Sequence, residues 1–130
     1  MAPRTIIIDD SNFIVTQLRK HFTETLGHQV VAVGKDGNEA VDLYRTHRPD
    51  LLAIDLSMPH KRGVDAIKEI IAEFPDARIV VISAVRSQEM IECIQLGAKS
   101  YIEKPLKFDT QEYVRDFALT VEEALGGSRG

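Results

Sequence analysis

The chain has 130 residues, a formal net charge of −4 and 44% hydrophobic residues, values typical of one globular domain with its own core. The acidic balance argues against a nucleic-acid groove, and the lack of a signal-peptide core or of an apolar run of about 18 residues argues against export or membrane insertion, so we expect a cytoplasmic protein. The single Cys93 excludes an intramolecular disulfide and a thiolate zinc cluster, and its helical surroundings indicate a partly buried, unreactive thiol.

Five apolar runs predict strands, each followed by a segment with helical periodicity. The run 51–54 is wholly apolar and bounded by turn signals, which indicates a strand buried on both faces. The strands are predicted at residues 5–8, 29–33, 51–54, 78–82 and 100–103. The helices are predicted from Ser11-Asn12 to Gly27, from a capping box at Asp36 and Glu39 to Pro49, from Gly63 to Pro75, from Ser87 to Gly97, and from Asp109 with Glu112 to Leu125.

This strand-helix alternation predicts a parallel sheet, because helical segments of 10 to 15 residues between strands make right-handed crossovers. Five units are too few for an eight-stranded barrel, so we expect an open, doubly wound α/β fold. We assign residues 1–125 to one domain and expect residues 126–130, rich in glycine, to be a disordered tail.

Polar residues follow four of the predicted strands. Asp9 and Asp10 follow the first, Asp55 the third, Ser83 the fourth and Lys104 the fifth. In parallel sheets these carboxyl ends form the edge where ligands bind, so we expect the side chains to gather there. Any one of them alone could merely cap or turn the chain.

Three neighbouring carboxylates require a positive partner, since two like charges about 4 Å apart repel by roughly 4 kcal/mol near a protein surface. Lys104 and a divalent cation are the two candidates. A site made of oxygen ligands suits Mg²⁺, and a carboxylate beside such a cation could accept a phosphoryl group.

With these residues, the chain resembles the receiver domains of two-component response regulators, most closely the single-domain chemotaxis type. The resemblance spans about Thr5 to Leu125 and implies the strand order 2-1-3-4-5. It rests on Asp9-Asp10, Asp55 within the segment Asp55-Leu56-Ser57-Met58-Pro59, Gly63, Ser83-Ala84, Gly97-Ala98, Tyr101 and Lys104-Pro105, which keep the family's order and spacing.

The resemblance implies that Asp55 is phosphorylated by a histidine kinase or a phosphotransfer protein. Asp10 would bind Mg²⁺ directly, Asp9 through water, and Asp55 and the main-chain carbonyl of Ser57 would complete the protein ligands. Lys104 would pair with the phosphoryl group.

The same resemblance implies a switch. The Ser83 hydroxyl would donate to a phosphoryl oxygen, Tyr101 would move inward, and the Lys104-Pro105 peptide would be cis. Tyr101 as a plain half-buried packing residue is an equal alternative, and Ser83 could be a simple cap.

Self-dephosphorylation is expected to be slow. In this family the side chains two after the acceptor and two or three after the hydroxyl residue set the hydrolysis rate. Here they are Ser57, Val85 and Arg86, and none supplies a carboxylate or amide to orient water.

The resemblance places the output surface on the fourth helix, the fifth strand and the fifth helix, where a downstream protein or a phosphorylation-dependent second copy would bind. An ordinary solvated surface is the alternative. The charged residues expected on or near this output surface are Glu89, Glu92, Lys99, Glu103 and Lys107.

Other functions fit the residues less well. A flavodoxin-like electron carrier needs a phosphate-cradling loop where Asp9-Asp10 stands, and an aspartyl phosphatase needs a second Asp at Ser57. An unphosphorylated interaction module and a receiver fragment of a longer regulator stay open. The four histidines lack ligand spacing, so we expect surface roles for them.

Overall fold

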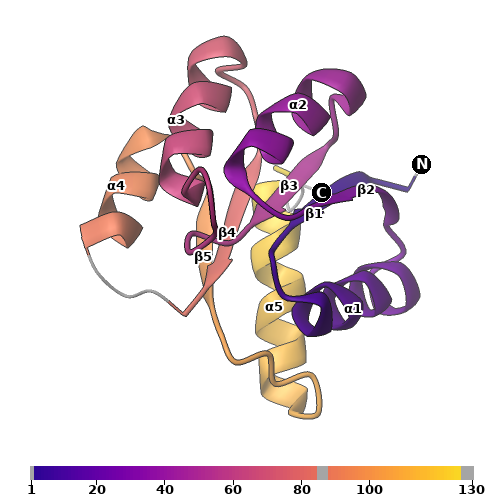
Figure 1. The fold of residues 1–130 in the computed structure, drawn as a ribbon. Helices are drawn as coiled ribbons and strands as arrows, with labels where there is room; N and C mark the ends of the chain where they lie inside the picture. The colour runs from indigo at the N-terminus through magenta and orange to yellow at the C-terminus, as the bar shows by residue number, and fades with distance from the viewer. Residues whose placement is uncertain (1, 85–87, 127–130) are drawn as a thin grey trace.

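A parallel five-stranded sheet in the order β2-β1-β3-β4-β5 forms the centre of the computed structural model, which describes residues 2–84 and 88–126. Helices cover both faces of the sheet (Figure 1). In chain order the elements are β1 (Arg4–Ile8), α1 (Asn12–Lys20), η1 (His21–Thr25), β2 (Gln29–Gly34), α2 (Gly37–His47), β3 (Leu51–Ile54), α3 (Gly63–Glu73), β4 (Ile79–Ser83), α4 (Gln88–Leu96), β5 (Ser100–Glu103) and α5 (Gln111–Ala124). The predicted fold class and strand order are confirmed.

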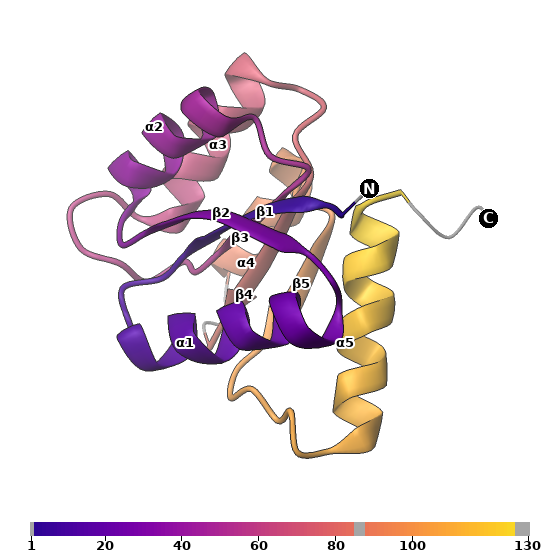
Figure 2. The same cartoon turned by 90° about the vertical axis from the view of Figure 1, so that its right-hand side faces the viewer.

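The two faces of the sheet bury separate cores. Leu52 and Ile54 of β3 point toward α2, α3 and α4, whereas Leu51 and Ala53 point toward α1 and α5. Figure 2 shows α1 and α5 on the opposite side of the sheet from α2 and α3. Because β3 is buried on both faces, its sequence is a continuous apolar run instead of an alternating one.

Helix boundaries differ from the prediction at two places. The first predicted helix changes after Lys20 into the π-helical turn η1, closed by a hydrogen bond from Leu26 N to His21 O of 3.1 Å. The last helix begins one residue late: Thr110 is its N-cap, no side chain caps it, and the expected box at Asp109 does not form. The residue at which a helix begins or ends is hard to predict from sequence, because several neighbouring residues can serve as its cap.

Two histidines depart from the expected surface positions. His21 stacks on Phe108 with ring centroids 3.8 Å apart, and the Nδ1 atom of His28 lies 2.8 Å from the Thr5 hydroxyl. Both imidazoles are buried, and burial lowers the pKa of each. Cys93 is also buried, which raises the pKa of its thiol to about 11 and keeps it protonated.

Part of the prediction concerns residues outside the described ranges. The Ser87 cap of α4, the Val85 and Arg86 side chains, and residues 127–130 of the predicted tail lie there. No helix in the described part of the chain is long and apolar enough to cross a membrane.

Candidate functional site

Three carboxylates meet where β1 and β3 end. These strands are paired in parallel with Ile8 beside Ile54, so Asp9 and Asp55 emerge side by side, and Asp55 N donates to Ile8 O at 2.9 Å. One carboxylate oxygen from each of Asp9, Asp10 and Asp55 lies within 4.8 Å of the others. Asp9 and Asp55 are buried and Asp10 is exposed, so the cluster opens to solvent on the Asp10 side.

Lys104 lies among these carboxylates. Its Nζ atom is 2.7 Å from Asp9 Oδ2 and 3.5 Å from Asp55 Oδ2, and its side chain is only 14% exposed. A cis Lys104-Pro105 peptide and a hydrogen bond from Lys104 N to Ser83 O of 3.1 Å fix the chain at this point. Three carboxylates against one ammonium leave two negative charges uncompensated within this described cluster, which matches the charge of one divalent cation.

The surroundings of Asp55 change the pKa of its carboxyl group. Burial raises its pKa, since removal from water disfavours the ionised form, and the charge of Asp9 adds to the effect. The Lys104 ammonium and a hydrogen bond with the Ser83 side chain oppose it. Burial and Asp9 therefore favour the protonated form of Asp55, whereas Lys104 and Ser83 favour the carboxylate.

The loop from Leu56 to Arg62 turns sharply away from Asp55. Leu56 N donates to Asp55 Oδ1 at 2.8 Å, and Gly63 N donates to Leu56 O at 3.0 Å. A Cβ at Gly63 would lie 2.2 Å from Asp55 O, so only glycine fits where the loop returns. Ser57, whose carbonyl is a predicted metal ligand, is exposed in this loop.

Ser83 and Tyr101 lie on the neighbouring strands β4 and β5. Ser83 is fully buried, and the half-buried Tyr101 donates its hydroxyl to Ser83 O at the long distance of 3.5 Å. Burial raises the pKa of Tyr101, so its hydroxyl stays a donor at neutral pH. The structure thus brings Tyr101 to the main chain of the predicted switch residue.

One contact near the site was not predicted. Gly37 N, in the first turn of α2, donates to Lys61 O at 2.9 Å, so this turn touches the loop that follows Asp55. In the sequence, Asp36 to Glu39 indicated only a capping box. Asp36 does cap α2, by accepting from Glu39 N at 2.9 Å, but a cap says nothing about a neighbour 24 residues further along the chain.

A surface cavity of about 640 Å³ lies away from the carboxylate cluster, between the helical segment α1-η1 and β2. Its lining includes Thr16, Arg19 and His28 but none of the predicted site residues.

The protein is therefore a doubly wound α/β domain that carries three clustered carboxylates and a lysine at the carboxyl edge of its sheet. Residues 5–113 match the response regulator receiver domain family. The chain belongs to this family.

Individual relatives agree with this assignment. The chain is 41% identical over 108 residues to the chemotaxis protein CheY of Thermotoga maritima, covering 82% of this chain and 89% of that protein. It is 40% identical over 110 residues to CheY of Bacillus subtilis, covering 84% and 91%. Among solved structures, it resembles a chain of the CheX-CheY-BeF₃-Mg²⁺ complex from Borrelia burgdorferi with a TM-score of 0.83 and 32% identity, covering 92% and 87%. The resemblance seen in the sequence is confirmed.

Proposed function

We propose that this protein is a signalling switch that accepts a phosphoryl group on Asp55 from a histidine kinase or phosphotransfer protein, in a reaction that depends on Mg²⁺. The observation that carries the proposal is the buried Asp55 carboxylate, 3.5 Å from Lys104 and beside two further carboxylates, at the open edge of a receiver fold. We also propose that the protein acts in the cytoplasm, as expected from the sequence.

In this reaction a carboxylate oxygen of Asp55 bonds to phosphorus while the P–N bond of the donor phosphohistidine breaks. The bonding electron pair leaves with the imidazole, which takes a proton from solvent. The side chain of Lys104 offsets negative charge on the transferred oxygens, and the Leu56 amide holds Asp55 Oδ1 in place. The protein is an acceptor and not a classical enzyme.

The donor set fits Mg²⁺. Asp10, Asp9, Asp55 and the Ser57 carbonyl offer only oxygen, and the two uncompensated negative charges of the cluster favour a divalent cation. Bound Mg²⁺ would supply further charge compensation for the phosphoryl oxygens.

The switch is proposed to run from Ser83 to the face formed by α4, β5 and α5. The Ser83 side chain is hydrogen-bonded with Asp55, and the Tyr101 hydroxyl donates to the Ser83 main-chain carbonyl. On α4, Ile91 and Ile94 are 46% and 45% exposed. Burial of these apolar side chains against a protein partner or a second copy would be more favourable than their exposure to water.

Slow self-dephosphorylation belongs to the same proposal. Ser57 is exposed and offers only a hydroxyl to an attacking water, while Val85 and Arg86 lie outside the described residues. After excess phosphodonor is removed, we expect the phosphorylated protein to persist for minutes or longer. A lifetime of seconds, followed by intact mass, would contradict this.

The deciding experiment is incubation with acetyl phosphate, with and without Mg²⁺, read by intact mass. We expect one phosphoryl group to be gained only with Mg²⁺, and none in Asp55→Asn. Asp65→Asn is the matched control, because Asp65 is an exposed aspartate on α3 that pairs with Arg62 outside the cluster. If the wild type binds Mg²⁺ but gains no mass, the unphosphorylated interaction module becomes the better interpretation.

A further inference from the structure

The loop between β3 and α3 is fixed at its two ends by different parts of the protein. At its start, Leu56 N donates to the Asp55 carboxylate, and Leu56 O accepts from Gly63 N. At its end, the Lys61 carbonyl accepts from Gly37 N of α2 at 2.9 Å. Ser57, with its proposed metal-binding carbonyl, lies between these anchors.

Gly37 leaves no space at the second anchor. It is buried, and a Cβ built on it would lie 2.6 Å from Lys61 O and 2.8 Å from Lys61 Cβ. The first of these atoms belongs to the backbone, so it cannot swing aside as a flexible side chain would. Ala40, Val41 and Tyr44 hold α2 against the core, so we expect the loop to move instead of the helix.

The segment that would move is short and stiff. Lys61 N donates to Pro59 O at 2.7 Å around His60, whose φ is +66°, which makes a tight γ-turn just before the anchor. Met58 packs against the core on the α2 side. We therefore expect a displacement of Lys61 to change the position of Ser57 as well.

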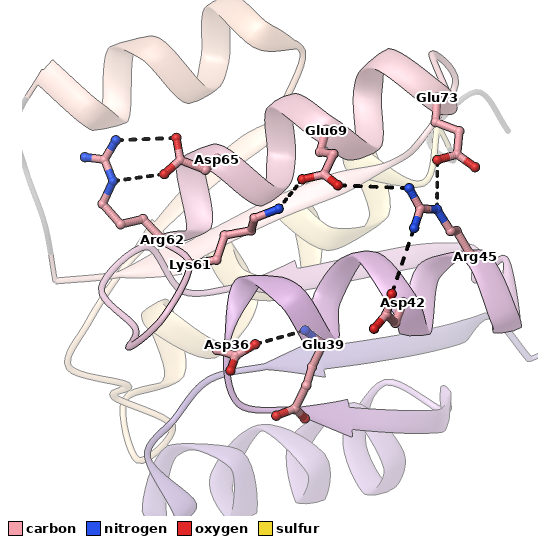
Figure 3. Close-up of polar contacts among 9 residues, drawn as sticks. All are labelled: Asp36, Glu39, Asp42, Arg45, Lys61, Arg62, Asp65, Glu69 and Glu73. Carbon is pink, nitrogen blue, oxygen red and sulfur yellow. Dashed lines mark hydrogen bonds and ion pairs between the residues drawn. The ribbon is translucent and has the colours of Figure 1, made fainter.

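Ion pairs reinforce this anchor, as Figure 3 shows. Lys61 Nζ pairs with Glu69 of α3, and the other Glu69 oxygen lies 4.0 Å from Arg45 of α2. Both pairs are partly exposed and contribute little stability in water. The main-chain contact at Gly37 is thus the stronger constraint, and Lys61-Glu69 the weaker one.

We propose that Gly37 is a positioning residue for the Mg²⁺ site. Its contact with Lys61 sets where the loop, and with it the Ser57 carbonyl, lies relative to Asp10 and Asp55. This inference rests on the proposed function, because it concerns the same metal site.

The test is the Mg²⁺ dissociation constant of Gly37→Ala, measured by titrating MgCl₂ into ¹⁵N-labelled protein and following amide shifts by NMR. We expect binding to weaken about tenfold, as is usual when a group that orients metal ligands is disturbed. In the metal-free spectra the amide signals of Ser57, Met58, His60 and Lys61 should already shift. At saturating Mg²⁺ the rate of phosphorylation by acetyl phosphate should recover most of the wild-type value.

Two controls separate positioning from general loss of stability. Asn38→Ala changes an exposed residue in the same helical turn, and Val121→Ala opens a cavity in the core on the other side of the sheet. Both should keep the wild-type Mg²⁺ affinity, although Val121→Ala unfolds at lower temperature. An unchanged affinity in folded Gly37→Ala, or an equal loss in Val121→Ala, overturns the inference.

If Gly37→Ala does not fold, Lys61→Met decides, since it removes only the weaker constraint, the ion pair with Glu69. We expect a two- to threefold weaker Mg²⁺ affinity, and no change overturns the inference. Failure of the wild type to bind Mg²⁺ contradicts the proposed function itself, whereas normal wild-type binding and phosphorylation with unaltered variants contradicts only the role of Gly37.

Discussion

The two faces of the sheet are stabilised in different ways. Between the sheet and the helices α1 and α5, the core is aliphatic but also contains a cluster of rings. The Phe117 ring centroid lies 5.7 Å from that of Phe22 and 5.1 Å from that of Phe108, and His21 stacks on Phe108. We call this side of the sheet the aromatic face. Between the sheet and α2-α3 the core is mainly aliphatic, and ion pairs such as Arg45-Glu73 at 2.9 Å connect the helices at the surface.

Because of this difference, we expect the aromatic face to affect mainly folding stability and the aliphatic face to affect the proposed metal site as well. The aromatic face holds two buried imidazoles, and His21 Nε2 is the one buried side-chain nitrogen or oxygen without a hydrogen-bond partner in the described part of the chain. The aliphatic face touches the loop beside Asp55 through Gly37. Changes on the aromatic face should alter folding and its pH dependence, whereas changes at the start of α2 should also alter the metal site.

The largest effect should come from removing a ring on the aromatic face. Phe117→Ala should lower the free energy of unfolding by about 3–5 kcal/mol, because it leaves a cavity where Phe117 is 2% exposed. Urea denaturation measures it. On the other face, Phe74 is half-buried, so Phe74→Ala should cost clearly less. Equal losses would mean that the two faces do not differ in this way.

A smaller effect concerns pH. Burial lowers the folded-state pKa of His21 and His28, although Asp50 opposes the shift at His28, so below pH 6.5 the unfolded chain binds more protons than the folded one. The stability they contribute is full above that pH and is lost as the pH falls toward the folded-state pKa values. We expect a loss of about 1 kcal/mol between pH 7.5 and 5.5, from urea denaturation at each pH.

The variant His21→Phe tests the origin of that loss. It keeps an aromatic ring against Phe108 and removes the unpaired Nε2, so it should be more stable and show a flatter pH dependence. Asp55 has a raised pKa and therefore favours the folded state as pH falls, which is the opposite sign. An unchanged slope in His21→Phe would assign the pH dependence to other groups.

The smallest effect should come from the ion pairs of the other face. Arg45→Met should lower the free energy of unfolding only slightly, and by less than Phe74→Ala, because Arg45 and its partners are nearly half exposed and solvent screens them. Urea denaturation at low and high salt should show the difference shrinking as salt increases. A loss as large as that of Phe74→Ala would show that these pairs are structural.

The alternation of strands and helices could be predicted from the sequence, because buried parallel strands are continuous apolar runs and the intervening helices repeat with their own period. The meeting of Asp9, Asp10, Asp55 and Lys104 could also be predicted, since parallel strands carry the residues that follow them to one edge. Strand order came from resemblance, because local patterns do not show which strands are neighbours.

The contacts between segments far apart in the chain could not be predicted and became known from the three-dimensional structure. Nothing local marks His21 for burial against Phe108, or distinguishes Gly37 as a cap residue from Gly37 as the neighbour of Lys61. Sequence periodicity reports which side of an element faces inward. Which atoms meet there depends on how the elements pack, and packing is fixed by the whole chain at once.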